Sequence, residues 1–149
     1  MNRIDYFSVK PELIKRLREV TKELEHCALD AKLRSVVETR VSQINGCAYC
    51  VDLHSREARQ RGETQQRLDS LPAWRESPFF DEREKAALAW AESLTLMPET
   101  HAGDVEYELV RKKFSDVEVV ELSIAVSLAN FWNRMAGGFR KIPVSVPVI

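Results

Sequence analysis

The sequence predicts an all-α subunit, and three observations carry this prediction. Apolar residues recur at intervals of three and four along most of the chain, capping signals bound these stretches, and no run of alternating apolar and polar residues supports a sheet. The chain has 149 residues, of which 44% are hydrophobic and 30% charged, with 5 Gly and 6 Pro. This composition excludes a fibrous or low-complexity protein and suits a single domain over residues 1–149, or a subunit that completes its core with a partner.

The first predicted helix begins near Pro11, which suits a first-turn position. Its apolar residues are spaced by four, three, four and three, and so form one stripe: Leu13, Leu17, Val20, Leu24 and Cys27. We therefore interpret Cys27 as a core residue of this helix.

The next two predicted helices are separated by a tight break. One begins after Asp30, a good N-cap, and runs to Ile44. Asn45-Gly46 marks the break, and the following helix covers about Cys47 to Arg61, with Gly62 beyond its end. The break places the first cysteine in the opening turn, where unpaired N–H groups and the helix dipole favour negative charge.

The sequence of the C-terminal half predicts further helices joined by irregular segments. Residues 63–80 hold one short helical stretch around Leu68, residues 97–103 form a loop, and residues 104–114 form a short helix. Capping-box patterns open the two longer helices, at 81–96 and 116–136. The last helix is apolar on nearly every side and ends at Gly137-Gly138, so we expect it to be buried on all faces, within the domain or against another subunit. Two prolines make the tail at 142–148 extended rather than a central strand.

Charge and cysteine usage exclude several classes of protein. With 22 basic and 23 acidic residues the net charge is -1, which disfavours a large nucleic-acid footprint. The longest strongly apolar run, Leu122 to Asn133, falls short of the roughly 20 residues of a membrane span. The N-terminus shows no signal-peptide pattern, and three cysteines are too few for a secreted disulfide framework. We therefore expect a cytoplasmic protein whose partners include neither nucleic acid nor membrane.

The chemistry concentrates at Cys47, Cys50 and His54. At roughly 100° per residue, Cys50 lies about 60° from Cys47 around the helix axis and His54 falls between them, so all three share one face. A helix N-terminus, a nearby imidazole and the Cys-x-x-Cys spacing can lower a thiol pKa from about 8.5 to about 7. The thiolate population then rises roughly 15-fold and outweighs a roughly 5-fold loss of nucleophilicity. Such a thiolate attacks peroxide, and a neighbouring thiol converts the sulfenic acid to a disulfide.

Metal-based interpretations of the cysteine pair fit less well. A zinc site with His54 as third ligand lacks an evident fourth, since the other histidines are His26 and His101. Iron–sulfur clusters usually need four cysteines, and haem attachment needs histidine directly after the second cysteine, where this chain has Val51. We therefore predict no metal and no cofactor. Taken alone, His54 could also be an ordinary solvated helix residue.

The stretch Arg40–His54, RVSQINGCAYCVDLH, resembles the alkylhydroperoxidase D-like branch of the carboxymuconolactone decarboxylase family. Residues 89–95 and 114–134 look like later helices of the same family. The resemblance implies an all-helical subunit that assembles into a homo-trimer or homo-hexamer. It also implies a peroxidase-like dithiol that reduces hydroperoxides and is recycled by an external dithiol or protein reductant.

The resemblance also implies roles for individual residues. Cys50 is the peroxide-attacking thiol, Cys47 the resolving thiol, and His54 part of the proton relay that activates Cys50. The family glutamate of this relay, twelve residues before the first cysteine, is here Ser35. Glu38, one helical turn on, can substitute for it, or Ser35 can hold a water.

Aromatic residues and rival functions complete the expectations. Tyr49 is expected to form a wall of the pocket, while Trp90, Phe131 and Trp132 are interpreted first as packing residues. The family name suggests one rival function, decarboxylation of a lactone acid, which has no need of two neighbouring thiols. A second rival is a non-enzymatic redox-sensing assembly, in which the disulfide alters contacts between subunits without turnover.

Overall fold

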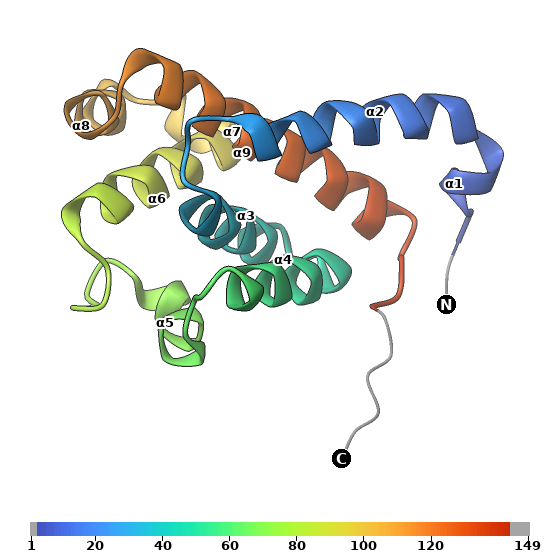
Figure 1. The fold of residues 1–149 in the computed structure, drawn as a ribbon, viewed down its shortest axis with the longest axis horizontal. Coiled ribbons are helices and arrows are strands. Elements are labelled where there is room, and N and C mark those ends of the chain that lie inside the picture. The colour runs from blue at the N-terminus through green and yellow to red at the C-terminus, as the bar shows by residue number, and fades with distance from the viewer. Residues whose placement is uncertain (1–2, 144–149) are drawn as a thin grey trace.

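Helices make up the regular secondary structure of the computed structural model, which describes residues 3–143 (Figure 1). No strand occurs within that range, so the all-α prediction is confirmed. The helices are α1 (Tyr6–Val9), α2 (Pro11–Glu23), α3 (Ala31–Asn45), α4 (Ala48–Gln60), α5 (Gln65–Ser70), α6 (Glu82–Thr95), α7 (Met97–Thr100), α8 (Asp104–Lys113) and α9 (Asp116–Gly138). Two short 3₁₀ helices follow α2 and α5, at Leu24–His26 and Leu71–Ala73.

The predicted capping signals define the ends of the main helices. The Asp30 carboxylate accepts the N–H of Leu33 at 2.8 Å and so caps α3. Reciprocal capping boxes open α6, at Asp81 and Glu84, and α9, at Ser115 and Glu118. These side chains satisfy amide groups that the first turn of a helix leaves unpaired.

The core forms where α3, α6 and α9 pack against one another, with α4 lying along α3 (Figure 1). Val37, Val41, Leu88 and Leu122 are completely buried there. Helix α3 is buried along most of its length, including Glu38, which is 7% exposed. A carboxylate therefore sits inside the protein next to α4, which carries the cysteines.

The first long helix is shorter than its apolar stripe suggests. Helix α2 ends at Glu23, and Cys27 lies beyond the following 3₁₀ turn, partly exposed and unpaired. The prediction that Cys27 is a core residue is therefore wrong. Ile14 and Leu24 turn inward, whereas Leu13 and Val20 are more than half exposed, because this arm-like helix covers the domain with only part of its surface (Figure 1).

Helix α9 is not buried on all faces within one chain. Leu122, Ala125 and Val126 face the core, but Val117, Val120 and Ile124 are 60%, 58% and 45% exposed. The helix ends at Gly138, the second residue of the glycine pair that was expected to end it. The apolar surface of α9 that points away from the core is left largely exposed by the described residues.

Single-turn helices form at two places where the sequence predicted no helix. Asp5 caps α1, and α7 accommodates Pro98 in its first turn, where the missing N–H costs little. The expected extended tail at 142–148 lies largely outside the described residues. None of the helices within residues 3–143 combines the length and apolar character needed to cross a membrane.

Candidate dithiol site

The two cysteines occupy the start of α4, directly after a sharp turn. Gly46 has φ 67°, in the left-handed region that favours glycine, and ends α3. Cys47 is the N-cap of α4, and its Sγ accepts the backbone N–H of Cys50 at 3.3 Å. The two sulfurs are joined in a disulfide, with the Cα atoms 5.3 Å apart. The predicted pairing geometry at the helix N-terminus is therefore present.

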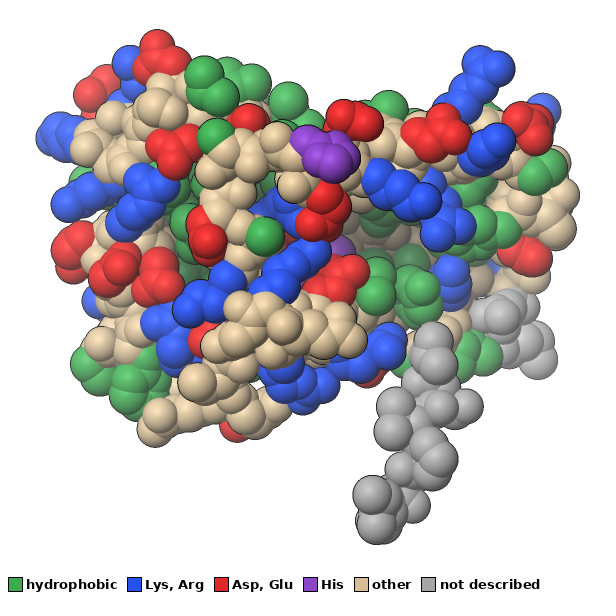
Figure 2. Space-filling view, in the orientation of Figure 1, with side chains coloured by type: hydrophobic (Ala, Val, Ile, Leu, Met, Phe, Trp, Pro, Cys, Tyr) green, Lys and Arg blue, Asp and Glu red, His purple; other side chains and the backbone are tan. Residues whose placement is uncertain are grey.

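A cavity of about 520 Å³ opens beside this disulfide. Cys50 lines it and Cys47 does not, although each cysteine is 2% exposed. The Sγ of Cys50 lies 3.9 Å from the carbonyl oxygen of Trp132. In the space-filling view a hollow between α2 and α4 has a partly hydrophobic floor, bordered by basic and acidic side chains (Figure 2). A molecule entering this cavity meets Cys50 rather than Cys47.

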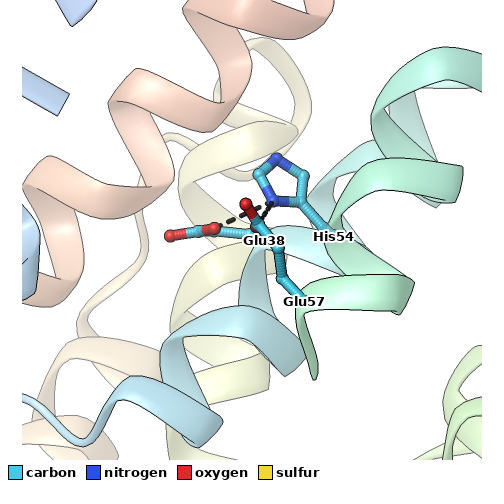
Figure 3. A group of neighbouring side chains, drawn as sticks. All are labelled: Glu38, His54 and Glu57. Carbon is cyan, nitrogen blue, oxygen red and sulfur yellow. Dashed lines mark hydrogen bonds and ion pairs between the residues drawn. The ribbon is translucent and has the colours of Figure 1, made fainter. Parts of the chain in front are cut away.

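His54 is held between two carboxylates. Its Nδ1 lies 3.0 Å from an oxygen of Glu38 on α3 and 3.0 Å from an oxygen of Glu57 on α4 (Figure 3). The other ring nitrogen is on the far side of the imidazole from both carboxylates (Figure 3). His54 also lines the cavity, one helical turn after Cys50. The two carboxylates thus orient Nδ1 and leave the other ring nitrogen able to exchange a proton with a bound molecule.

The two carboxylates keep His54 protonated at neutral pH. Burial by itself lowers the pKa of His54, but the hydrogen bonds and negative charges of Glu38 and Glu57 outweigh it and raise that pKa from 6.5 to about 9. The pKa of Glu57 is lowered: burial raises it, but the hydrogen bond to His54 and the positive charges of His54, Arg61 and Arg34 together outweigh this effect. An imidazolium flanked by carboxylates is therefore the resting state.

Arginines surround this cluster. Arg34, itself 3% exposed, places Nε 3.2 Å from Glu38 and also pairs with Glu25. Arg61 binds the same carboxylate of Glu25 at 2.8 Å. These guanidinium groups offset the acidic charges of the cavity. The negative charge of the buried carboxylates is therefore balanced by the arginines as well as by His54.

Ser35 has a structural role rather than a place beside the histidine. Its hydroxyl donates to the carbonyl oxygen of Ala31 at 3.0 Å and accepts a hydrogen bond from Arg61. Glu38, three residues later, supplies the carboxylate that reaches His54. The acid that contacts the imidazole is therefore Glu38, the residue that the sequence offered as a substitute for the family glutamate at position 35.

Sequence reasoning missed Glu57, Arg34 and Arg61. The spacing of three between His54 and Glu57 on one predicted helix was a usable signal, since such pairs face each other. Arg34 precedes Glu38 by four residues, which was also a usable signal, whereas Arg61 contacts Glu25 across 36 residues and carried no local signal for that pair. Tyr49 and Trp132 both line the cavity, so Trp132 forms a wall of the cavity as well as packing. Trp90 is buried and donates to Ser123 at 2.9 Å, as a packing residue would.

Glu38, His54 and Glu57 are also the residues with which a metal ion could be held. One ligand atom from each lies within 4.8 Å of the others. The Nδ1 that would bind the ion is the atom that shares a proton with the carboxylates, and Arg34 already neutralises part of their charge. The donor set therefore fits a protonated histidine better than a cation.

Fold and site together define the class of protein: an all-α subunit of the alkylhydroperoxidase D-like kind, with a Cys-x-x-Cys pair at a helix N-terminus. The chain belongs to the carboxymuconolactone decarboxylase family, whose model matches residues 11–93.

Individual relatives agree with this assignment. The chain is 37% identical to the uncharacterized protein YdfG of Bacillus subtilis, over 90% of this chain and 91% of YdfG. Its fold matches the crystal structure of ATU0492 from Agrobacterium tumefaciens with a TM-score of 0.95 and 36% identity, covering 98% and 100% of the two chains. ATU0492 is a protein of unknown function for which a role as the antioxidant defence protein AhpD has been suggested. A peroxidase-related protein from Ralstonia eutropha shares the fold, with a TM-score of 0.82 at 19% identity, over 93% of this chain and 74% of its own.

Proposed function

We propose that this protein is a thiol-dependent peroxidase that reduces hydroperoxides through a Cys47–Cys50 dithiol and disulfide cycle. The observation that carries the proposal is the unequal access of the two sulfurs. Cys50 lines the cavity next to His54, whereas Cys47 lies behind it as the helix cap. The cysteine that faces the cavity is suited to attack the substrate, and the cysteine behind it to resolve the product.

The proposed chemistry begins with the thiolate of Cys50. It attacks the terminal oxygen of the hydroperoxide, the O–O bond breaks, and the alkoxide leaves as an alcohol after taking one proton. Cys50 is then a sulfenic acid, two electrons more oxidised than the thiolate. Cys47 attacks this sulfur, the disulfide forms, and the hydroxyl leaves as water. An external dithiol supplies two electrons and two protons to restore the reduced pair.

His54 acts in this scheme as a cation and proton donor. Because its pKa is about 9, it carries a proton at neutral pH and cannot serve there as the base that deprotonates Cys50. Its positive charge instead stabilises the thiolate one helical turn away, and its proton neutralises the leaving alkoxide. Glu38 and Glu57 fix the ring and maintain its charge. This assignment gives Glu38 the function for which the family glutamate was expected at position 35.

The test compares the two single cysteine variants after one equivalent of hydroperoxide. In the reduced wild type, mass spectrometry of the Cys47–Cys50 peptide is expected to show loss of two hydrogens. Cys47→Ser is expected to trap a sulfenic acid at Cys50, detected as a dimedone adduct, whereas Cys50→Ser should give no adduct at residue 47. An unchanged wild-type dithiol, or an adduct on Cys47 in the Cys50→Ser variant, contradicts the proposal.

Steady-state assays separate the rival functions. Continuous peroxide consumption with a dithiol reductant supports an enzyme, whereas a single stoichiometric oxidation supports a redox sensor. A decarboxylase acting on a lactone acid would retain its activity when both cysteines are replaced by serine. Loss of peroxide consumption in the same double variant, with no decarboxylation in either protein, supports the peroxidase.

We also propose that the working form is a homo-oligomer, a trimer or hexamer, recycled by a dithiol or protein reductant. Support comes from the exposed apolar residues of α9, Val117, Val120 and Ile124. A groove next to them, which includes Tyr107 and Leu128, continues this apolar surface. Soluble monomers rarely expose large contiguous apolar patches, and such patches mark sites of contact with other molecules.

A further inference from the structure

The cavity beside Cys50 has an excess of positive charge. Five cationic side chains and three carboxylates line it, so its lining is positive by two charges before the proton on His54 is counted. The chain as a whole has a net charge of -1. The lining residues concerned are Arg18, Lys22, Arg34, Arg61, Lys141, Glu25, Glu38 and Glu57. Positive potential is thus concentrated where the proposed chemistry takes place.

Three of these cations have no acidic partner. Arg34 and Arg61 are engaged by Glu25, whereas Arg18, Lys22 and Lys141 have no carboxylate within ion-pair distance among residues 3–143. The three come from two separate segments. Arg18 and Lys22 are one turn apart on α2, and Lys141 follows α9, held there by its backbone N–H, which donates to Ala136 at 2.8 Å.

The unpaired cations lie next to apolar and aromatic walls. The ammonium of Lys141 is 4.1 Å from the ring centre of Phe7 and 4.4 Å from that of Tyr49. Leu53 and Trp132 also line the cavity. Figure 2 shows the same combination, with basic side chains bordering a hollow whose floor is partly hydrophobic. Such a surface fits a molecule with an apolar body and one anionic end.

We propose that the substrate is an amphipathic hydroperoxide that carries a carboxylate, bound by Arg18, Lys22 and Lys141, with its peroxide group at Cys50. This proposal rests on the proposed peroxidase function and adds the substrate class. The cavity volume of about 520 Å³ is within the usual range for small-molecule sites, roughly 300–1,000 Å³. The cations supply selectivity, while the thiols and His54 supply the reaction.

Binding without turnover tests the anion site by itself. Calorimetry measures octanoate and its neutral analogue octanamide against the full-length wild type, the variant Arg18→Gln/Lys22→Gln/Lys141→Gln, and a charge-matched control. The control, Arg16→Gln/Lys112→Gln/Lys113→Gln, removes three exposed cations that do not line the cavity. Exposed ion pairs give roughly two- to fivefold each, so we expect octanoate to bind the wild type and the control about 10-fold more tightly than octanamide.

The cavity variant is expected to bind both ligands equally, and circular dichroism checks that it is folded. The wild-type preference should also weaken between 0.05 and 0.5 M salt, roughly the range over which exposed charges become screened. Equal binding of both ligands by the wild type, or a preference for octanoate that survives in the cavity variant, overturns the anion site.

Kinetics then connect the anion site to the reaction. Linoleic acid hydroperoxide and its methyl ester are compared at one fixed dithiothreitol concentration, and the readout is the ratio of their kcat/KM values. We expect the acid to be favoured about 10-fold by the wild type and the control, and the ratio to fall to near one in the cavity variant. Reduction of both substrates at equal rates by the wild type refutes the substrate class alone. Preferential binding of octanoate without reduction of either hydroperoxide refutes the peroxidase and leaves an anion-binding cavity.

Discussion

Replacing His54 by glutamine removes a buried positive charge, and the cost should depend on pH in a defined way. The pKa of His54 is raised from 6.5 to about 9 in the folded protein. A tenfold difference in proton affinity corresponds to about 1.4 kcal/mol, so the proton on His54 contributes about 3 kcal/mol to the free energy of unfolding. Because the folded pKa is the higher one, this contribution is complete below pH 6.5 and is lost as the pH rises through 9.

The assay is urea unfolding of the oxidised protein, followed by circular dichroism from pH 6 to pH 10. With the disulfide intact, Cys47 and Cys50 do not titrate within this range. The stability difference between wild type and His54→Gln is expected to shrink by about 3 kcal/mol between pH 6 and pH 10, with most of the change between 6.5 and 9.

A matched control shows that the effect belongs to the carboxylate cluster. His26 is exposed and has no carboxylate within ion-pair distance among the described residues, so His26→Gln should leave the pH dependence of stability as it is in the wild type. A stability difference between wild type and His54→Gln that stays constant across the range would refute the reasoning. It would mean that His54 is not charged by Glu38 and Glu57 in the folded protein.

Three further perturbations test other parts of the structure. Glu57→Gln removes one of the two acids at His54 and should move the alkaline decline of peroxide reduction to lower pH, with little change in rate at pH 6; an unmoved pH–rate profile would contradict the role of Glu57. Ile124→Asp places a charge in the exposed apolar surface of α9 and should lower the molar mass seen by light scattering; an oligomer of unchanged mass would exclude this face as the contact. Leu122→Ala empties a fully buried core position and should lower the free energy of unfolding in urea by about 2–5 kcal/mol; a loss below about 1 kcal/mol would contradict the packing described.

The helices that frame the core were predictable because their signals are local. An N-cap such as Asp30, a capping box such as Ser115 with Glu118, and a glycine at Gly46 each act within a few residues. The four-residue helix α1 has no such periodicity to reveal it. It contacts a distant part of the chain, since the ring centre of Tyr6 lies 5.4 Å from that of Phe139.

The candidate site was predictable in part for the same reason. Cys47, Cys50 and His54 lie on one helix, so their proximity follows from spacing alone. Glu38 reaches His54 from another helix, and its contribution depends on how α3 packs against α4, which no local pattern encodes. For Cys27 a local pattern was misleading. Its spacing continued the apolar stripe of α2 and predicted a core residue, but the helix ends before Cys27.

The connection between α3 and α4 contains very little chain. Asn45 ends α3, Gly46 follows, and Cys47 already caps α4. A residue added there would change the position and rotation of α4 relative to α3. A single insertion would therefore carry the imidazole of His54 away from Glu38 without replacing either side chain. The length of this connection therefore sets how α3, which carries Glu38, is oriented relative to α4, which carries the cysteines and His54. The proposed reaction depends on this length as well as on the reactive side chains.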